Sequence, residues 1–308
     1  MPEDSDERYL AAMEPSVRIL TELADSIRQL STAMPDVETQ GFAEILSDGA
    51  LTSGQEGHTS ATTHSLSGLA LMAASDHVRA FARLHSAAPA PVFAHVTLTR
   101  AALEALVWAR WLGEPGPNVD PPERRRRGLA ARLYSALEEA RVPEARESAN
   151  ADAARLTAVA VANGWTVVGR DRRNLAVGGL ALPSIPTEFS RLLVVPVERF
   201  GVTLWSHLCG VSHGTLYGLL SGVAESNAHP LDPNVQTATL GGDSRSVNTL
   251  VLLLLRGIRL TTRERLTLMG WQSPEWDRAD RNAGELERVL VRALYGINLG
   301  VPMVVRSR

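Results

Sequence analysis

The stretch RFGVTLWSHLCGVSHGTLYGLLSGVAE, residues 199–225, has no Asp, Glu or Arg between its first and last residues. Within it a small residue recurs at every fourth position: Ser206, Gly210, Gly214, Gly218 and Gly222. This spacing predicts one face of a helix at about 200–223. Because small side chains let a neighbouring backbone approach closely, we expect this helix at the centre of the fold, with His213 in the interior.

The rest of the chain also has helical periodicity. We expect helices at about 5–34, with Pro15 interrupting it, and at 59–88, 91–112, 121–142, 143–163, 187–223, 243–270 and 273–298. Gly and Pro interrupt residues 164–186, and a second long loop is expected at 226–242. The sequence therefore predicts an all-α multi-helix bundle with a central Gly-striped helix (about 200–223) and one short irregular or hairpin insertion (about 164–186).

Composition and charge are those of a globular protein with an uneven charge distribution. The chain has 308 residues, of which 44% are hydrophobic and 21% charged. Residues 1–60 contain 12 acids against 3 arginines, whereas the remainder has a net charge of +6. We therefore expect an acidic N-terminal helical arm (1–58) that packs on a helical-bundle core domain (59–308).

Several classes of chemistry are excluded by residue types that are rare or absent. All 31 basic residues are arginine, so no lysine can form a Schiff base or a phosphate-loop contact. Cys209 is the single cysteine, which excludes an internal disulfide and a Cys-based zinc site. No His and Glu spacing indicates a metal site, and we expect neither a metal nor a cofactor.

The sequence predicts a cytoplasmic protein. The first residues, MPEDSDERYL, lack the cationic and apolar segments of a secretory signal. The uncharged run 200–224 is long enough to span a bilayer, but Gly, Ser, Thr and His dilute its apolar content. We therefore expect no membrane contact.

Two small polar groups on apolar helices are the first site candidates. Arg100 and Glu104 lie one turn apart among apolar residues, so both charges are expected to face the interior together. They form either a structural ion pair or an anion clamp with a base beside it. In the central helix, Ser212, His213 and Tyr217 are the corresponding polar candidates.

Two further candidates carry charge on other helices. Asp76 and His77 follow an apolar segment of the helix at 59–88. Four consecutive arginines, including Arg124 and Arg127, fall in the first turn of the helix at 121–142, where the helix dipole favours acids. They are either a solvated face paired with nearby acids or a phosphate site.

Two motifs resemble known families. Arg79 and His85 have the Arg-x5-His spacing of HEPN-type helical ribonucleases. Arg100-Ala-Ala-Leu-Glu104 followed by Ser212-His213-Gly214 resembles uncharacterised actinobacterial all-helical proteins, loosely similar to HEPN and abortive-infection families. The resemblance covers about 76–222 and implies a helical fold with an internal polar site. The arginine that often precedes the downstream His in such proteins is replaced here by Ser206 or His207.

The leading hypothesis is a protein that binds a small anionic or phosphate-bearing ligand, such as a nucleotide, in an internal polar site. His213 or Glu104 would be the acid–base group and Arg100 the anion clamp, which leaves open whether the protein is an enzyme. The expected ligand-binding residues are Asp76, His77, Ser212, Tyr217, Arg124 and Arg127. A local RNA contact is not favoured, because the chain is acidic overall and poor in aromatic residues.

Three alternatives remain at this stage. The first is a non-catalytic homodimeric helical interaction protein, in which the glycine stripe and the ion pair are structural. The second is a biosynthetic enzyme with an enclosed apolar cavity, similar to a terpene cyclase but without its Asp-rich metal motif. The third is a serine hydrolase, because Gly210-Val-Ser212-His-Gly214 matches the GxSxG pattern.

Overall fold

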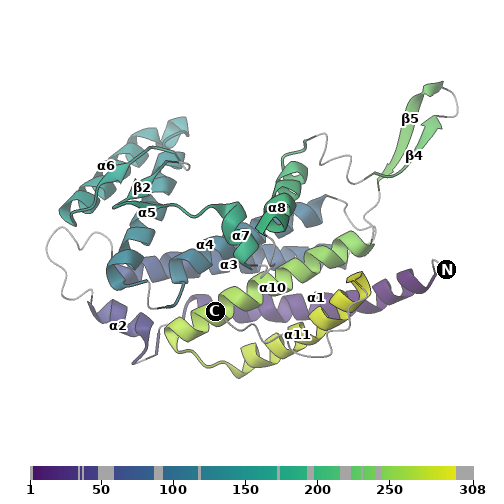
Figure 1. Cartoon of the computed structure of the whole chain (residues 1–308), viewed down its shortest axis with the longest axis horizontal. Coiled ribbons are helices and arrows are strands. Elements are labelled where there is room, and N and C mark those ends of the chain that lie inside the picture. Colours follow the sequence, from purple (N-terminus) through teal and green to yellow (C-terminus); the bar gives the residue numbers. More distant parts are fainter. Residues whose placement is uncertain are drawn as a thin grey trace.

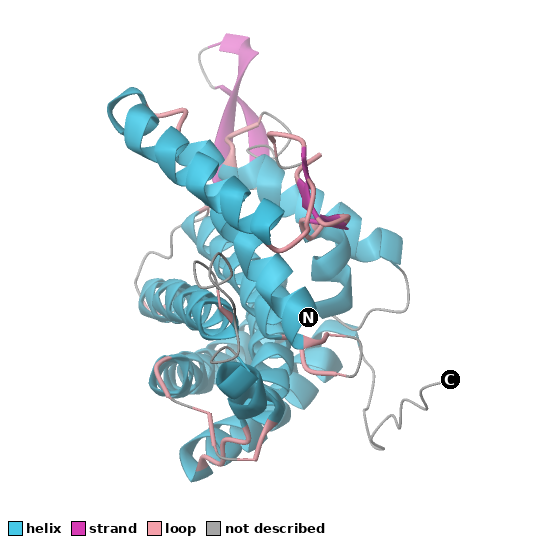
Figure 2. Cartoon of the chain, turned by 90° about the vertical axis from the view of Figure 1, so that its left-hand side faces the viewer, coloured by secondary structure: helices cyan, strands magenta, loops and turns pink. Residues whose placement is uncertain are grey.

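The computed structural model describes residues 3–33, 35–36, 38–47, 59–86, 93–116, 119–171, 174–192, 198–215, 223–229, 232–240 and 244–295. These residues form ten α-helices, one short 3-10 helix and two small antiparallel sheets. Figure 2 shows that helices make up most of the molecule and that the strands lie outside the bundle. The predicted all-α multi-helix bundle is therefore confirmed.

The helices have the following bounds. They are α1 (Glu3–Ser31), α2 (Gln40–Ser47), α3 (Ser60–His85), α4 (Ala94–Gly113), α5 (Pro121–Glu139), η2 (Pro143–Ala145), α6 (Arg146–Ala162), α7 (Ile185–Leu192), α8 (Glu198–Ser212), α10 (Ser244–Met269) and α11 (Pro274–Tyr295). None of the helices within the described ranges is long and apolar enough to cross a membrane.

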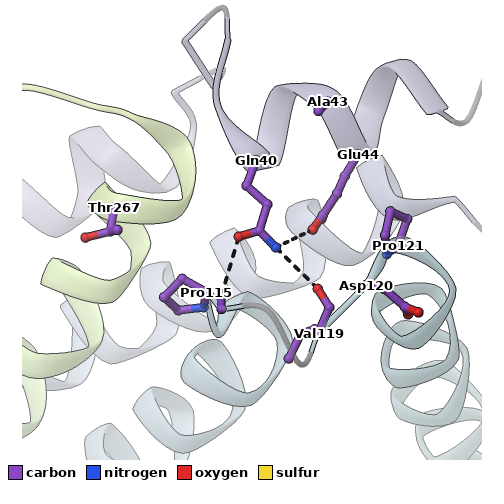
Figure 3. Close-up of a pocket in the computed structure, with 9 residues that line it drawn as sticks. Gln40, Ala43, Glu44, Pro115, Val119, Asp120, Pro121 and Thr267 are labelled. Carbon is purple, nitrogen blue, oxygen red and sulfur yellow. Dashed lines mark hydrogen bonds between the residues drawn. The ribbon is translucent and has the colours of Figure 1, made fainter. Parts of the chain in front are cut away.

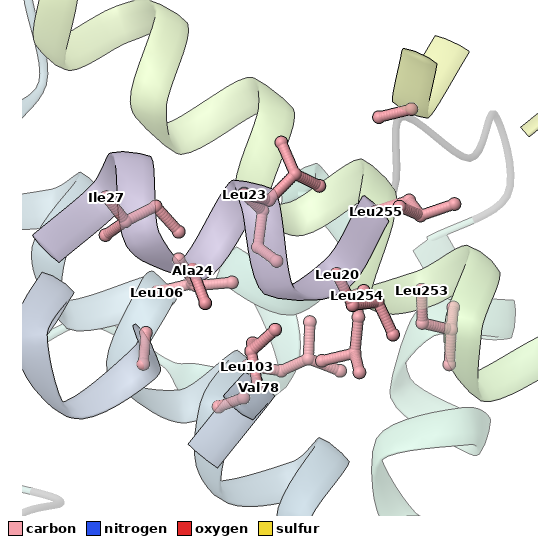
Figure 4. Close-up of a cluster of buried hydrophobic side chains, with 14 of the residues drawn as sticks. Leu20, Leu23, Ala24, Ile27, Val78, Leu103, Leu106, Leu253, Leu254 and Leu255 are labelled. Atoms are coloured by element: carbon pink, nitrogen blue, oxygen red, sulfur yellow. The ribbon is translucent and has the colours of Figure 1, made fainter. Parts of the chain in front are cut away.

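Five long helices form the body of the molecule. Figure 1 shows α1, α3, α4, α10 and α11 running along its long axis, and α3 packs against both α1 and α4 while α10 packs against α4 and α11. Their apolar faces meet in one cluster that includes Leu20, Leu23, Leu103 and Leu254, all fully buried (Figure 4). Burial of these faces is the main force that holds the bundle together.

The predicted N-terminal arm contributes to this same cluster. Leu20 and Leu23 lie on α1, and they are as deeply buried as the leucines of α4 and α10. The predicted division between 1–58 and 59–308 stays a prediction, while the packing joins α1 directly to helices of the second segment.

A second hydrophobic cluster lies at one end of the bundle. It joins α5, α6 and the sheet of β1 (Val167–Val168), β2 (Ala176–Val177) and β3 (Leu180–Ala181), with Leu129, Leu156 and Val177 fully buried. Trp108 of α4 packs against both clusters. α4 therefore connects the long-helix bundle to this smaller group of elements.

Helix starts follow the capping signals of the sequence. Asp120 accepts a hydrogen bond from the backbone N–H of Glu123 at 2.7 Å, with Pro121 as the first helical residue of α5. Ser273 accepts one from the N–H of Trp276 at 3.1 Å, at the start of α11. Both helices therefore begin at a residue whose side chain caps the first turn.

The predicted helix at 187–223 is wrong in its extent. The chain forms α7 and α8 there, and α8 ends at Ser212. Gly214 has a φ of +64°, the left-handed conformation that ends helices, and the N–H of Thr215 bonds back to the carbonyl of Gly210 at 3.0 Å. Gly218 and Gly222 lie outside the described residues.

The glycine stripe is also not the buried face of α8. Ser206 is exposed, whereas Trp205 and Leu208 are buried and pack on the central cluster. Large apolar side chains gain more from burial than small ones, and they set the orientation of this helix.

Three further expectations are corrected or completed by the structure. α1 continues through Pro15 without a break, and α2 was not expected at all. Residues 164–186 contain the small three-stranded sheet, where the sequence predicted a short irregular or hairpin insertion. The loop expected at 226–242 is wrong, because β4 (Val223–His229) pairs with β5 (Asp232–Leu240) in an antiparallel hairpin, drawn clear of the bundle in Figure 1.

Candidate functional site

Arg100 and Glu104 form the ion pair that their spacing predicts. Arg100 Nη2 lies 3.4 Å from Glu104 Oε2, and about a quarter of each side chain is exposed. The Arg100 guanidinium also lies over the ring of Trp205, 5.5 Å from its centroid, which joins α4 to α8. The pair is therefore half-buried and contributes to helix packing.

His213 does not lie in the interior. It follows the last residue of α8 and is exposed, because α8 ends at Ser212, well before the end at about 223 that the glycine stripe predicts. Ser212, at the end of α8, is half-buried, and Tyr217 lies outside the described residues. A GxSxG nucleophile needs a strand before the serine and a helix after it, whereas Ser212 ends a helix.

Asp76 and His77 lie on α3, away from a common interior site. Asp76 is exposed and lies 3.6 Å from Arg28 Nη1 in a surface ion pair. His77 is half-buried. On the same helix, Arg79 pairs with Asp25, whereas His85 is buried and its ring centroid lies 5.9 Å from that of His95.

Arg124 and Arg127 are buried rather than solvated. They lie three residues apart on one face of α5 and point at the C-terminal turn of α4. Arg124 Nη1 donates to the carbonyl of Leu112 at 2.8 Å, and Arg127 Nη1 donates to that of Trp111 at 2.7 Å. The last carbonyls of a helix lack helical partners and form the negative end of its dipole. The two arginines supply both the donors and the compensating charge.

Arg124 also holds a carboxylate that no sequence pattern indicated. Its Nε donates to Glu44 Oε2 at 2.5 Å, and Nη2 donates to the carbonyl of Glu114 at 3.0 Å. Arg124 is fully buried and the Glu44 side chain is 2% exposed. Burying either charge without its partner would cost several kcal/mol, so α2 and α5 depend on each other at this point.

His64 and Arg265 complete this buried group. His64 Nε2 lies 3.0 Å from Glu44 Oε2, and its Nδ1 lies 3.2 Å from Arg265 Nη1. Arg265 also donates from Nη2 to the carbonyl of His64 at 3.1 Å. We call Glu44, His64, Arg124 and Arg265 the buried network. It joins α2, α3, α5 and α10 beside the end of α4.

Gly113, at the end of α4, leaves room for side chains of this group. A Cβ on Gly113 would lie 2.8 Å from Ser67 Oγ and 3.3 Å from Arg265 Nη1. Ser67 Oγ donates to the carbonyl of Ala109 at 2.8 Å. A larger residue at position 113 would therefore displace the Ser67 hydroxyl and crowd the Arg265 guanidinium.

The hydrogen bonds fix the protonation of His64. A guanidinium only donates, so Nδ1 of His64 accepts from Arg265 and carries no proton, and Nε2–H donates to Glu44. Burial lowers the pKa of His64 to about 4, aided by the charges of Arg265 and Arg124 and opposed by Glu44. The imidazole is neutral at physiological pH.

Glu44 remains ionised in spite of its burial. Burial alone would raise its pKa, but the hydrogen bond from His64 and the charge of Arg124 outweigh that effect and lower the pKa below its usual value. Burial, with the charge of Arg124, lowers the pKa of Arg265 to about 9. The network therefore contains one carboxylate and two guanidinium groups at neutral pH.

A pocket of about 750 Å³ opens beside Glu44. Its lining comes from α2, the connection between α4 and α5, and α10: Gln40, Ala43, Glu44, Pro115, Gly116, Val119, Asp120, Pro121 and Thr267. Figure 3 shows the Gln40 side chain bridging the pocket. Its Nε2 donates to Glu44 Oε1 at 2.9 Å and to the carbonyl of Val119 at 3.3 Å.

The pocket presents mainly hydrogen-bond acceptors. Glu44 Oε2 already receives two donors, from Arg124 and His64. Among the described residues Oε1 receives only that of Gln40, which leaves an acceptor position open. The second charged side chain of the described lining, Asp120, is also a carboxylate. Within the described ranges, no group of three His, Cys, Asp or Glu side chains is placed to hold a metal.

Comparison with protein-family models, curated proteins and solved structures gave no match. The functional proposal therefore depends on the geometry of this chain. One signal for the site was present in the sequence, since four arginines at a helix N-terminus indicate a compensating partner. Glu44, His64 and Arg265 gave no such signal, because their spacing along the chain follows no local pattern.

Proposed function

We propose that this is a cytoplasmic protein that binds a small organic amine in the pocket beside Glu44. The observation that supports it most is the Glu44 carboxylate in the pocket lining, whose Oε1 receives one hydrogen bond, from Gln40, among the described residues. Asp120 provides a second carboxylate, and Pro115 and Pro121 provide apolar surface for the rest of the ligand. An ammonium group supplies the donors and the charge that these acceptors match.

A phosphate-bearing ligand, the class predicted from the sequence, fits this pocket less well. Its described charged lining is acidic, and the guanidinium groups of Arg124 and Arg265 are buried behind Glu44 and committed to protein partners. A phosphate beside two carboxylates would be repelled by both.

The protonation states favour binding over acid–base catalysis. An efficient general acid or base has a pKa near the working pH. The pKa of His64 is about 4 and both ring nitrogens are engaged, while Glu44 has a pKa below its usual value. The network thus holds the Glu44 carboxylate in place and keeps it charged.

The test compares three ligands that share one ring: benzylamine, benzyl alcohol and benzyl phosphate. We expect benzylamine to bind at neutral pH with the highest affinity, measured by calorimetric or NMR titration. Ala43→Trp places bulk at the exposed pocket edge and should abolish binding, whereas Ala293→Trp, at an exposed site on α11, should not. Preferential binding of benzyl phosphate, or benzylamine binding that Ala43→Trp leaves intact, would contradict the proposal.

A second variant tests the charge. Asp120→Asn keeps a good helix cap but removes one carboxylate. We expect the affinity for benzylamine to fall about fivefold or more, as for the loss of a charged hydrogen bond. Asp277→Asn, in the first turn of α11, is the matched control and should leave the affinity unchanged.

Two other hypotheses from the sequence, the homodimer and the enzyme with an enclosed apolar cavity, stay predictions. The measured mass of the purified protein in its native state, against 33.2 kDa for one chain, tests the first directly.

A further inference from the structure

A second pocket, of about 630 Å³, lies along α5. α3, α4, α5 and α6 all contribute to its lining: Leu66, Ala70, Trp108, Leu112, Ala131, Arg132, Tyr134, Ser135, Ala136, Glu138, Glu139 and Asp152. None of these residues lines the pocket beside Glu44. We call it the α5 pocket, and its volume is in the range that holds a small organic ligand.

The buried part of this lining is apolar. Leu112 and Ala136 are buried, and Leu66 is half-buried against the same hydrophobic cluster. Trp108 and Tyr134 stack on each other, with 6.1 Å between their ring centroids, so that they form one wall. Because these side chains come from three helices that pack together, the apolar surface exists before any ligand arrives. It favours a ligand with an apolar body.

Most of the carboxylates of the lining are already balanced by protein cations. Glu138 accepts a hydrogen bond from Arg141 at 2.9 Å, and Asp152 pairs with Arg155. The third carboxylate, that of Glu139, belongs to an exposed residue, where water and ions screen its charge. The carboxylates therefore give the pocket no strong negative charge.

Arg132 is the remaining charged side chain of the described lining. It is half-buried, and within the described ranges it forms neither an ion pair nor a hydrogen bond. In contrast, Arg124 and Arg127 of the same helix both bind carboxylates and backbone carbonyls. A guanidinium group carries five N–H donors in a planar fork and a permanent positive charge. Arg132 can therefore offer these donors to a ligand.

From this combination we infer that the α5 pocket binds a small monocarboxylate with an apolar body. The carboxylate would accept parallel hydrogen bonds from the Arg132 guanidinium, and the apolar body would lie against Leu112, Ala136 and the stacked rings. A monoanion matches a single guanidinium, whereas a dianionic phosphate would leave one charge beside the carboxylates of the lining. The ligand is opposite in charge to the amine proposed for the other pocket, and this inference does not depend on that proposal.

The test uses 3-phenylpropanoate, 3-phenylpropan-1-ol and 3-phenylpropylamine, which share one apolar body and differ in charge. We expect the carboxylate to bind about fivefold or more tightly than the alcohol in an NMR titration of the full chain at neutral pH, as for the gain of a charged hydrogen bond. Equal affinity for the carboxylate and the alcohol would overturn the inference.

One variant tests the guanidinium. Arg132→Gln breaks no ion pair or hydrogen bond of the described residues, so it should fold normally. We expect it to lower the affinity for 3-phenylpropanoate to about that for the alcohol. Arg281→Gln, at an exposed position of α11, is the matched control and should leave both affinities unchanged. Carboxylate binding that Arg132→Gln leaves intact would contradict the inference.

A second variant locates the site. Ser135→Trp places bulk at an exposed position of the lining and should abolish binding of the carboxylate and the alcohol. Ala43→Trp, which changes the other pocket, should leave both unaffected. Carboxylate binding that is lost in Ala43→Trp instead, or a preference for the amine that Ser135→Trp removes, would overturn the assignment to the α5 pocket.

Discussion

Two arginine–glutamate pairs, one on α4 and one beside its C-terminal end, differ in almost every physical respect. Arg100 and Glu104 are one turn apart on the same helix and are a quarter exposed. Arg124 and Glu44 are 80 residues apart in sequence and nearly inaccessible to solvent. The first pair follows from helix geometry alone, whereas the second exists only when α2 and α5 are both in place. Burial, rather than the presence of a pair, decides how much each contributes.

The largest effect is expected from breaking the buried pair. Arg124→Met leaves the Glu44 carboxylate buried beside the neutral His64, and unpaired buried charges cost about 3–5 kcal/mol. The free energy of unfolding, measured by urea denaturation, should fall by about that amount. The double variant Arg124→Met/Glu44→Leu should recover part of the loss, because it leaves neither of the two charges unpaired. A loss below about 1 kcal/mol in Arg124→Met would show that the buried pair behaves like a surface pair.

A smaller effect for each titrating group is expected from acid. Burial lowers the pKa of His64 to about 4, and burial with the charge of His95 does the same for His85. Below pH 6.5 the unfolded chain therefore binds protons that the folded chain does not, and the free energy of unfolding decreases as the pH is lowered. Each His contributes a loss that grows to about 3 kcal/mol near pH 4. Below pH 4.5 the lowered pKa of Glu44 adds a loss of the same sign.

The acid effect is measured by denaturant unfolding at a series of pH values. The slope of stability against pH should show net proton uptake on unfolding between about pH 6.5 and pH 4. A flat profile over this range would contradict the neutral, buried state of His64 and His85.

The smallest effect is expected at the half-buried pair. Arg100→Gln removes an i,i+4 contact and a cation–aromatic contact with Trp205, and such partly exposed interactions contribute about 1 kcal/mol or less. The loss should shrink further in high salt, because water and ions reach the pair. Denaturant unfolding at low and high salt measures the loss of stability and its dependence on salt. A loss as large as that of Arg124→Met would show that the two pairs do not differ in their contribution to stability.

The same comparison explains how much the sequence could predict. The long helices and the pairing of Arg100 with Glu104 depend on residues within one or two turns, and local spacing predicted them. Glu44 lies in an eight-residue helix that was not expected, and its partners His64 and Arg124 come from two other helices. The burial of those partners depends on which helix faces meet, which the spacing of residues along the chain does not specify.

The prediction that His213 lies in the interior was wrong for a related reason. The every-fourth pattern through Gly210 and Gly214 fits a helix, but a single glycine in the left-handed conformation ends α8. A glycine in a helical pattern has two meanings, close packing or termination, and only the surrounding contacts decide between them.

The 80-residue separation of Glu44 and Arg124 has a consequence for how the chain reaches its native state. Burying either charge before its partner is in place costs desolvation free energy, so docking of α2 is unfavourable until α5 has packed against the end of α4. α2 would then dock after α5, although it is synthesised before α5. Its docking would complete the protein only when residues far downstream have been synthesised.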